Sequence, residues 1–358
     1  MIRTLFVFFI SLGVLAIARP AAALEYDPTV CNGYQPGDEY SEACLEMMAA
    51  YPEPVVIQIQ PDSLTLSSYS YWKIGPHAVN LYDAPNGNII GQKPAGFNFV
   101  LATDVVDGWV QIEGGQWIRE EDTDYTPASQ FRGVRILDGL QYPFAWVLDT
   151  TGLYTSAYPD GPQDVENGRL LMRYDLINIF AEYVDEDGWI WYMVGPNQWI
   201  EQRFVAVAKR VERPEGVEGR WVAVDLYEQT LVAYEDDTPV FATLVSSGAP
   251  PWDTNEGIFT VWARLDRDGM SGATGAPDAY ALQSVPWVMY FDDSISLHGT
   301  YWHDLFGYRH SHGCVNLSIS DAAYVYDWTG SAQPDENGDI VTYVYVYSSG
   351  EYGERTKP

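Results

Sequence analysis

Apolar and polar residues alternate along much of this chain in short runs, with turn-forming pairs between them. A typical run is Trp-Val-Gln-Ile at 109–112, which follows an Asp-Gly pair. A period of two is typical of β-strands with one buried face, and Asp-Gly or Asn-Gly between two such runs favours a tight hairpin turn. The pattern therefore predicts a mainly β protein.

One set of strands and turns occurs twice. Both copies contain a Leu-Tyr pair, an Asp-Gly-Trp group and a Gln-Trp-Ile group. These groups begin at residues 81, 107 and 116 in the first copy and at residues 153, 187 and 198 in the second. Units of this length can bury one modest core. We therefore expect small β-barrels over residues 71–125 and 140–208.

A third domain is predicted after a charged linker at 209–219. Strand-like runs cover 221–226, 230–234 and 240–245, and they favour a β-meander that opens a domain spanning residues 217–348. Further on, Ser320 is predicted to cap a short helix over residues 321–328.

The chain begins with the features of a secretory signal peptide. Arg3 supplies a positive charge, residues 5–18 form an apolar run, and three alanines at 21–23 offer a cleavage site. An uncleaved anchor is the weaker alternative, because a membrane span needs about 20 apolar residues. We expect removal of residues 1–23, no membrane anchor after cleavage, and a protein that is secreted or held in the cell envelope, in the periplasm or cell wall.

The three cysteines have two predicted fates. Residues 24–70 are predicted as a partly ordered N-terminal extension with a short helix over 44–50, and they contain Cys31 and Cys44. Export would place these thiols in an oxidising compartment, so the two are expected to form a local disulfide. Cys314 is then left over as a reactive or intermolecular thiol.

The net charge argues against one class of partner. Asp and Glu number 50 against 19 Lys and Arg, which gives a formal charge of −31 at pH 7. Nucleic acid phosphates and anionic membrane surfaces repel a uniformly acidic protein. We therefore predict no nucleic-acid binding, and the sequence assigns no oligomeric state.

Residues that could carry chemistry gather late in the chain. Four of the five histidines lie in the same 19-residue stretch, 298–316, as Cys314. A thiol is nucleophilic as its thiolate, and a nearby imidazole can take its proton. His298 ends a strand-like run and His312 lies two residues before Cys314, so either imidazole could be the base. Gly313 would allow backbone amides to approach an oxyanion closely.

Two stretches of this region resemble a known family. Ser-His-Gly-Cys-Val-Asn at 311–316, preceded by His-Gly-Thr at 298–300, resembles the signature of L,D-transpeptidases with a YkuD-type catalytic domain. Ser-Ser-Gly at 246–248 and residues 254–259 also fit, except that Thr-Asn replaces a Thr-Pro pair. The resemblance covers about residues 219–329. It implies a cysteine-dependent acyltransferase that acts on peptidoglycan stem peptides without cofactor or metal.

The resemblance also implies roles for the motif residues. Cys314 would attack the third residue of a stem tetrapeptide and release D-alanine, and an amine would resolve the thioester into a 3-3 cross-link. His298 would be the base, oriented by the carbonyl of Gly299. His312 and the amides of Gly313 and Cys314 would shape the oxyanion hole. Further candidates are Ser311 and Asn316 as supports of this turn, and Tyr290, Trp302 and Arg309, near the motif in sequence, as lining of a substrate groove.

The repeated units resemble bacterial SH3-like domains, which often bind cell-wall peptide or glycan. The alternative is that their aromatic side chains are barrel core, and we expect this for the recurring Trp109, Trp117, Trp189 and Trp199. The expected fold is thus mainly β, with two small SH3-like β-barrels followed by a β-rich L,D-transpeptidase catalytic domain that has a short helix after the catalytic cysteine.

Other functions fit parts of the sequence. A zinc enzyme could draw ligands from the histidine cluster and Cys314, although no His-Glu-x-x-His pattern supplies a catalytic glutamate. A non-catalytic wall-binding protein could use the repeats alone. Within the enzyme class, water could resolve the thioester, as in an L,D-carboxypeptidase, or a D-amino acid or a protein amine could do so.

Two loops carry smaller expectations. The glycine-rich segment 266–275 is either a lid over the site or an ordinary hairpin. Residues 335–339 resemble a calcium loop, but an Asn-Gly pair between strands favours a hairpin turn, and no metal is assigned there.

Overall fold

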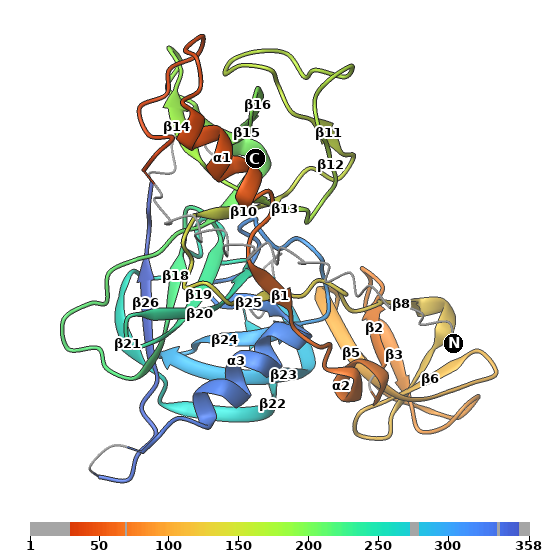
Figure 1. Ribbon diagram of the computed structural model, residues 1–358. Helices are drawn as coiled ribbons and strands as arrows, with labels where there is room; N and C mark the ends of the chain where they lie inside the picture. Colours follow the sequence, from red (N-terminus) through yellow and green to blue (C-terminus); the bar gives the residue numbers. More distant parts are fainter. Residues whose placement is uncertain (1–28, 69, 273–278, 335–336, 351–358) are drawn as a thin grey trace, which may run out of the picture.

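The computed structural model describes residues 29–68, 70–272, 279–334 and 337–350, and the predicted signal peptide lies outside these ranges. The protein is mainly β, as predicted. Figure 1 shows a first module (residues 70–125, orange), a second module (residues 144–208, yellow to green) and a C-terminal domain (residues 217–347, green to blue). Within the described ranges, no helix is long and apolar enough to cross a membrane.

The N-terminal extension runs along the second module and then joins the C-terminal domain. Cys31 forms a disulfide with Cys44, which lies in the first turn of helix α1 (Glu42–Ala50). The buried side of this helix packs with tryptophans of the second module. The chain continues through strand β1 (Val56–Gln58) and helix α2 (Ser63–Ser68), which lie beside the C-terminal domain in Figure 1.

The first module is a compact set of antiparallel strands. Its elements are β2 (Ser70–Ile74), β3 (Val79–Tyr82), β4 (Ile89–Lys93), β5 (Phe97–Val106), β6 (Trp109–Ile112), β7 (Trp117–Arg119), the 3-10 helix η1 (Glu120–Asp122) and β8 (Thr123–Tyr125). Strand β2 pairs with both β5 and β8, and β6 lies between β5 and β7. Alternate residues of these strands bury one aliphatic core, which includes Val100, Val110 and Ile118.

The second module repeats this order of elements. They are β10 (Phe144–Val147), β11 (Leu153–Tyr154), β12 (Leu170–Leu171), β13 (Leu176–Asn178), β14 (Ala181–Val184), β15 (Ile190–Gly195), β16 (Gln198–Glu201), the 3-10 helix η2 (Gln202–Phe204) and β17 (Val205–Ala208). As in the first module, a 3-10 helix precedes the last strand, and that strand pairs with the first one. The internal repeat therefore corresponds to two units of like topology, and their SH3-like character stays a prediction.

Only two of the four recurring tryptophans are core residues. Trp109 and Trp199 are buried, as expected, whereas Trp117 and Trp189 are only partly buried. Trp189 lies at a turn beside β15, where the guanidinium of Arg203 covers its ring at 4.5 Å from the ring centre. The expectation of core tryptophans is therefore confirmed for Trp109 and Trp199 and wrong for Trp117 and Trp189, because an equivalent position in a repeat does not decide how much of a ring meets solvent.

The C-terminal domain contains a seven-stranded sheet in the order β1-β9-β20-β19-β18-β26-β21. Its further strands are β9 (Val134–Ile136), β18 (Arg220–Asp225), β19 (Thr230–Glu235), β20 (Thr238–Leu244), β21 (Gly257–Thr260) and β26 (Tyr343–Tyr347). The predicted β-meander is confirmed as β18–β19–β20. Strand β1 of the extension and β9 of the linker between the modules complete one edge of this sheet.

A second sheet carries the histidine and cysteine motif. It contains β22 (Ala263–Gly272), β23 (Tyr280–Asp292), β24 (Ile295–Thr300) and β25 (Val315–Ser318). The glycine-rich segment lies largely in β22, which pairs with β23 as a hairpin arm, and residues 273–278 are outside the described ranges. Strand β23 also pairs with β5, so this sheet is continuous with that of the first module.

Helix α3 (Ile319–Gly330) follows the motif, as predicted, but begins earlier than expected. Its N-cap is Ser318 and not Ser320, because the hydroxyl of Ser318 accepts a hydrogen bond from the amide of Asp321 at 3.1 Å. This places Asp321 at the third helical position, where the positive end of the helix dipole stabilises its negative charge. The helix contacts β23, β24 and β25.

Candidate active site

The motif residues line one small pocket of about 220 Å³. Three parts of the chain form it: the first module, the β22–β23 hairpin and the segment from β24 to β25. The lining residues are Phe97, Met270, Tyr280, Leu282, His298, Trp302, His310, Ser311, His312, Cys314 and Asn316. Five of the predicted motif residues therefore share one cavity.

Strand register places Cys314 and His298 on the same face of the sheet. Strands β24 and β25 run parallel, with His298 opposite Asn316, and Cys314 directly precedes β25. Because side chains alternate between the faces of a strand, residues 296, 298, 314 and 316 share one face. The Cys314 sulfur lies 3.6 Å from the hydroxyl of Ser296, the neighbour of His298 on that face. The thiol and the imidazole consequently open to the same pocket.

His298 is held as a neutral imidazole. Its side chain is 2% exposed, and its Nδ1 donates a hydrogen bond to the carbonyl of Gly299 at 3.2 Å. This bond leaves Nε2 without a proton and able to accept one. Burial lowers the pKa of His298 to about 4, with the Gly299 carbonyl acting weakly in the opposite direction. At neutral pH the side chain is therefore a free base.

Cys314 is a partly buried thiol. Burial raises its pKa, and contacts with Ser296 oppose this effect. Burial thus favours the uncharged form of both the imidazole and the thiol. The base has to remove the proton during attack on the substrate.

Alkylation of the native protein with iodoacetamide is expected to label Cys314 alone, since Cys31 and Cys44 are joined in a disulfide. Because the thiol pKa is raised, the rate constant should keep rising with pH beyond about 8.5, the pKa of a free cysteine. Peptide mapping finds the label, and time courses at several pH values give the rate. A rate already at its plateau at pH 7 would show a stabilised thiolate, and labelled Cys31 would disprove the disulfide.

A tight turn presents the nucleophile. The Ser311 hydroxyl accepts a hydrogen bond from the Gly313 amide at 3.1 Å and donates to the carbonyl of Cys314. Gly313 has a φ of 113°, a conformation that favours glycine. The Thr254 hydroxyl accepts from the Gly248 amide and donates to the Gly313 carbonyl at 2.7 Å. The two segments that fit the family pattern upstream of the motif therefore brace this turn.

The turn changes the expected oxyanion hole. The amide of Gly313 already donates to Ser311, which leaves the amide of Cys314 as the backbone donor of the predicted pair. His312 is exposed, and the centre of its ring lies 5.5 Å from that of Trp252 and 5.0 Å from that of Tyr280. Of the two candidate bases, His298 is the buried one.

Asn316 links the turn to the loop after β24. Its amide lies 2.9 Å from Nε2 of His303, whose Nδ1 accepts a hydrogen bond from the Leu305 amide. A neutral ring that accepts at Nδ1 carries its proton at Nε2, so the amide oxygen of Asn316 is the group that must face it. Burial lowers the pKa of His303, in keeping with this neutral form.

The three candidates for the substrate groove lie in different places. Trp302 lines the pocket, and its ring centre is 5.5 Å from that of His298. Tyr290 lies outside the lining and donates a hydrogen bond to Asp268 at 2.8 Å. Arg309 also lies outside it, donating to the Gly248 carbonyl at 2.6 Å and pairing with Asp253. Arg309 thus braces the loop behind the turn.

Sequence reasoning missed most of the apolar lining. Met270, Tyr280 and Leu282 come from the β22–β23 hairpin, of which the sequence analysis considered only residues 266–275, as a lid over the site or an ordinary hairpin. Phe97 comes from the first module, far away in sequence. The Tyr-Ala-Leu run at the start of β23 could have suggested the hairpin residues, but nothing near Phe97 marks it as part of a site.

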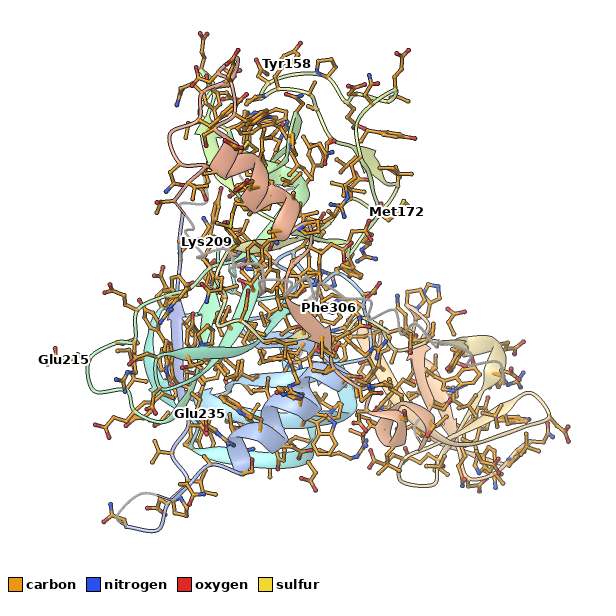
Figure 2. The ribbon with its side chains drawn as sticks, viewed as in Figure 1. Tyr158, Met172, Lys209, Glu215, Glu235 and Phe306 are labelled. Carbon is orange, nitrogen blue, oxygen red and sulfur yellow. A yellow bond between two sulfur atoms is a disulfide. The ribbon has the colours of Figure 1, made fainter. Side chains whose placement is uncertain are left out.

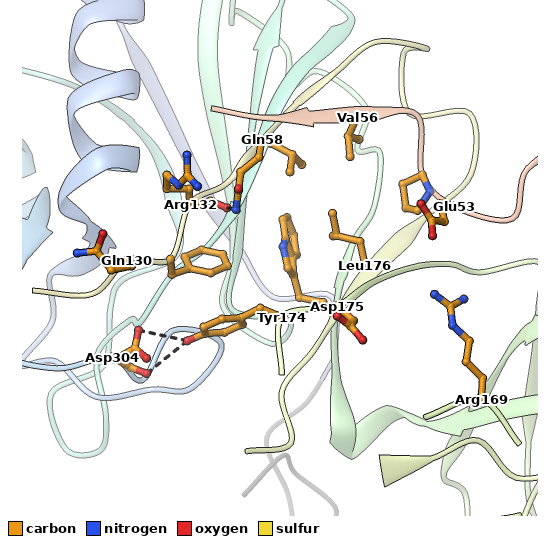
Figure 3. A pocket seen from close by; sticks show the side chains of 14 residues that line it. Glu53, Val56, Gln58, Gln130, Arg132, Arg169, Tyr174, Asp175, Leu176 and Asp304 are labelled. Atoms are coloured by element: carbon orange, nitrogen blue, oxygen red, sulfur yellow. Dashed lines mark hydrogen bonds between the residues drawn. The ribbon is translucent and has the colours of Figure 1, made fainter. Parts of the chain in front are cut away.

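A larger cavity of about 850 Å³ lies at the junction of the extension, the second module and the C-terminal domain. Figure 3 shows its lining, with the hydroxyl of Tyr174 bonded to Asp304. Asp304 also forms an ion pair with Arg173 at 2.9 Å. The loop that carries His303 is therefore held by the second module, and Phe306 of the same loop lies near the centre of the molecule in Figure 2.

The described residues contain no group of three or more His, Cys, Asp or Glu side chains placed to hold a metal ion. The site instead combines a thiol, a neutral imidazole fixed by a carbonyl, and a backbone amide at a tight turn. These are the parts needed for nucleophilic acyl transfer through a thioester.

Residues 219–346 match the YkuD family, the L,D-transpeptidase catalytic domain. This match covers just over a third of the chain and includes both His298 and Cys314. The two modules and the N-terminal extension lie outside the match. No curated protein matches the chain.

Several solved structures are similar to the chain over part of its length. An L,D-transpeptidase from Stackebrandtia nassauensis is 26% identical and aligns over 40% of this chain and 62% of its own, with a TM-score of 0.29. The catalytic domain of the E. faecium L,D-transpeptidase is 24% identical over 37% of this chain and 99% of its own, with a TM-score of 0.31. An L,D-transpeptidase from Mycobacterium smegmatis is 18% identical over 61% and 90%, with a TM-score of 0.32.

Proposed function

We propose that this protein is an exported L,D-transpeptidase that cross-links peptidoglycan in the cell envelope. The observation that carries the proposal is the shared pocket of Cys314 and His298 within a domain of the L,D-transpeptidase family. Peptidoglycan stem peptides are the substrates that the family implies. The apolar run and the alanines at the start of the sequence support export.

In the proposed acylation, the Cys314 sulfur attacks the carbonyl carbon of the third residue of a stem tetrapeptide. Nε2 of His298 takes the thiol proton as the carbon–sulfur bond forms. The bond to D-alanine then breaks, and the imidazolium returns the proton to the leaving amine. The amide of Cys314 faces the transient oxyanion. The product is a thioester on Cys314, with free D-alanine.

In the proposed second half, an amine of a neighbouring stem peptide attacks the thioester carbonyl. His298 takes a proton from this amine and returns it to the sulfur as the carbon–sulfur bond breaks. The result is a 3-3 cross-link and the original thiol. Because His298 is neutral at neutral pH, it is ready to act as a base in both halves.

The proposal extends to the two modules as SH3-like domains. In each of them the last strand follows a 3-10 helix and pairs with the first strand. Both modules place partly exposed aromatic side chains at strand ends, among them Trp117 and Trp189. Such surfaces suit cell-wall peptide or glycan. Sedimentation of the Cys314→Ala protein with purified wall sacculi tests this part, and no co-sedimentation would reject it.

The test of the catalytic proposal is mass spectrometry of the mature protein incubated with disaccharide-tetrapeptide muropeptides. We expect a dimer that is lighter than two monomers by one D-alanine. Loss of D-alanine without a dimer would instead show a carboxypeptidase, and incorporation of an added D-amino acid would show exchange. No change with any stem peptide would reject the substrate and favour a wall-binding protein.

A further inference from the structure

One wall of the active-site pocket comes from outside the catalytic domain. Phe97, the first residue of β5, lines the pocket with Cys314 and His298. The family match begins only at residue 219. The side chain of Phe97 is 37% exposed, so it keeps apolar surface that a molecule in the pocket could cover.

Backbone hydrogen bonds fix Phe97 relative to the catalytic strands. Strand β5 pairs in parallel with β23, with Phe97 opposite Tyr280. The amide of Phe97 donates to the carbonyl of Ala279 at 2.9 Å. Gly96 has a φ of 154°, and a Cβ at this position would lie 2.8 Å from the same carbonyl oxygen. A glycine therefore permits the two strands to meet at the pocket.

Side-chain packing behind the pocket makes the same connection. The rings of Tyr71, in the first module, and Tyr301, in the C-terminal domain, stack with their centres 3.6 Å apart. Tyr301 in turn contacts the edge of Trp302, which lines the pocket. These residues belong to one hydrophobic cluster that spans both parts. Close packing of this kind transmits a shift rather than absorbing it, so the first module cannot move away without disturbing the site.

The pocket lining has a definite chemistry. It contains no Asp, Glu, Lys or Arg side chain among the described residues. Apart from the cysteine, the histidines, Ser311 and Asn316, its surface is formed by apolar and aromatic groups, namely Phe97, Met270, Tyr280, Leu282 and Trp302. Such a surface favours an uncharged aliphatic chain over a charged group, because it offers no partner for a charge.

We propose that Phe97 is a specificity-determining residue whose ring contacts the methylene chain of the residue that Cys314 acylates. In a stem peptide this residue is a diamino acid, and its methylene groups adjoin the carbonyl under attack. The first module thus forms part of the substrate-binding site. The identity of the substrate rests on the proposed function above, whereas the contact between Phe97 and an aliphatic chain in the pocket does not.

The first test compares Phe97→Ala with the wild type on two tetrapeptides, one with a diamino acid and one with alanine at the third position. We expect kcat/KM for the diamino acid peptide to fall about tenfold, mainly through KM, as apolar contact area is lost. The alanine peptide should change less than twofold. Phe97→Leu should restore most of the loss. The matched control is Ile90→Ala, an exposed residue of β4 outside the pocket.

The second test needs no natural substrate. Cys314 is alkylated with iodoacetamide and with N-hexyl iodoacetamide, and the ratio of the two rate constants is compared between proteins. We expect Phe97→Ala to lower the preference for the hexyl reagent about fivefold, and Ile90→Ala to leave it unchanged. If the wild type converts no stem peptide, the proposed function fails and this ratio still decides the role of Phe97.

Two results would overturn the inference. One is an unchanged ratio of alkylation rates in Phe97→Ala, measured on protein with a wild-type melting temperature. The other is an equal fall in kcat/KM on both tetrapeptides, which would assign Phe97 a structural role only.

Discussion

Replacement of Cys314 by alanine is expected to abolish release of D-alanine from a stem tetrapeptide, with a loss of at least about 1,000-fold in kcat. The thiol is the only group in the pocket that can form the thioester, and His298 cannot activate a methyl group. The measurement is free D-alanine in a coupled oxidase assay, with dimer formation followed by mass spectrometry. Cys314→Ser, which keeps the shape of the side chain, should also be inactive, because a hydroxyl is a far weaker nucleophile beside a base with a pKa of about 4.

The fold should survive this change. The Cys314 sulfur contacts the hydroxyl of Ser296 and, at 3.8 Å, the carbonyl of Ser294, and neither contact is part of the hydrophobic core. The melting temperature of Cys314→Ala should therefore stay within a few degrees of the wild type. The matched control is Arg203→Ala, a remote change on the second module. Release of D-alanine by Cys314→Ala at a tenth of the wild-type rate or more would disprove that Cys314 is the nucleophile.

Replacement of Asp321 by alanine is expected to lower the free energy of unfolding by about 3–4 kcal/mol. Its carboxylate is fully buried and accepts hydrogen bonds at 2.6 Å from the amide of Gly133 and from the hydroxyl of Thr243. Alanine would leave both donors buried without a partner. Urea unfolding followed by tryptophan fluorescence measures the change. Asp327→Ala, an exposed position on the same helix, should cost less than about 0.5 kcal/mol, and an equal loss in both variants would contradict the argument.

The same carboxyl group gives a pH dependence of known sign. Burial raises the pKa of Asp321 from 3.8 to about 6 in the folded protein, with the hydrogen bonds opposing this effect. The folded state therefore holds the proton more tightly than the unfolded state. Its contribution to stability is largest below about pH 4, falls as the pH rises to about 6 and is constant above that. Relative to Asp321→Asn, the wild type should lose about 2 kcal/mol between pH 4 and pH 7.

Local sequence features predicted the catalytic motif and the first strands of the C-terminal domain. The run from 311 to 316 and the upstream His-Gly pair indicated the nucleophile and base, and the meander β18–β19–β20 followed from apolar runs bounded by turns. The N-cap was misplaced by two residues because two serines precede the same acidic residue. The spacing Ser-x-x-Asp decides between them, since only Ser318 can reach the amide of the third helical residue.

Pairing between distant strands could not be predicted in this way. The strand β5 has an alternating pattern that fits a small barrel, and nothing in it shows that its first residues also pair with β23. The same holds for β1 and β9, which extend a sheet whose central strands β18, β19 and β20 lie at residues 220–244. The side-chain pattern of a strand does not show which distant strand its backbone will pair with. The lining residue Phe97 was missed for this reason.

Because its sheets include strands from other parts of the chain, the C-terminal domain needs more of the chain to fold than residues 219–346, which match the family. A fragment limited to residues 219–346 would lack β9, which pairs with β20, and β5, which pairs with β23. Their partners β20 and β23 would then have open edges that could pair with other copies of the fragment. The amide of Leu101 donates a hydrogen bond to the side chain of Gln283, 182 positions away, and contacts of such large sequence separation are expected to slow folding. Expression of the full chain, and not of the isolated catalytic domain, should therefore give the soluble enzyme.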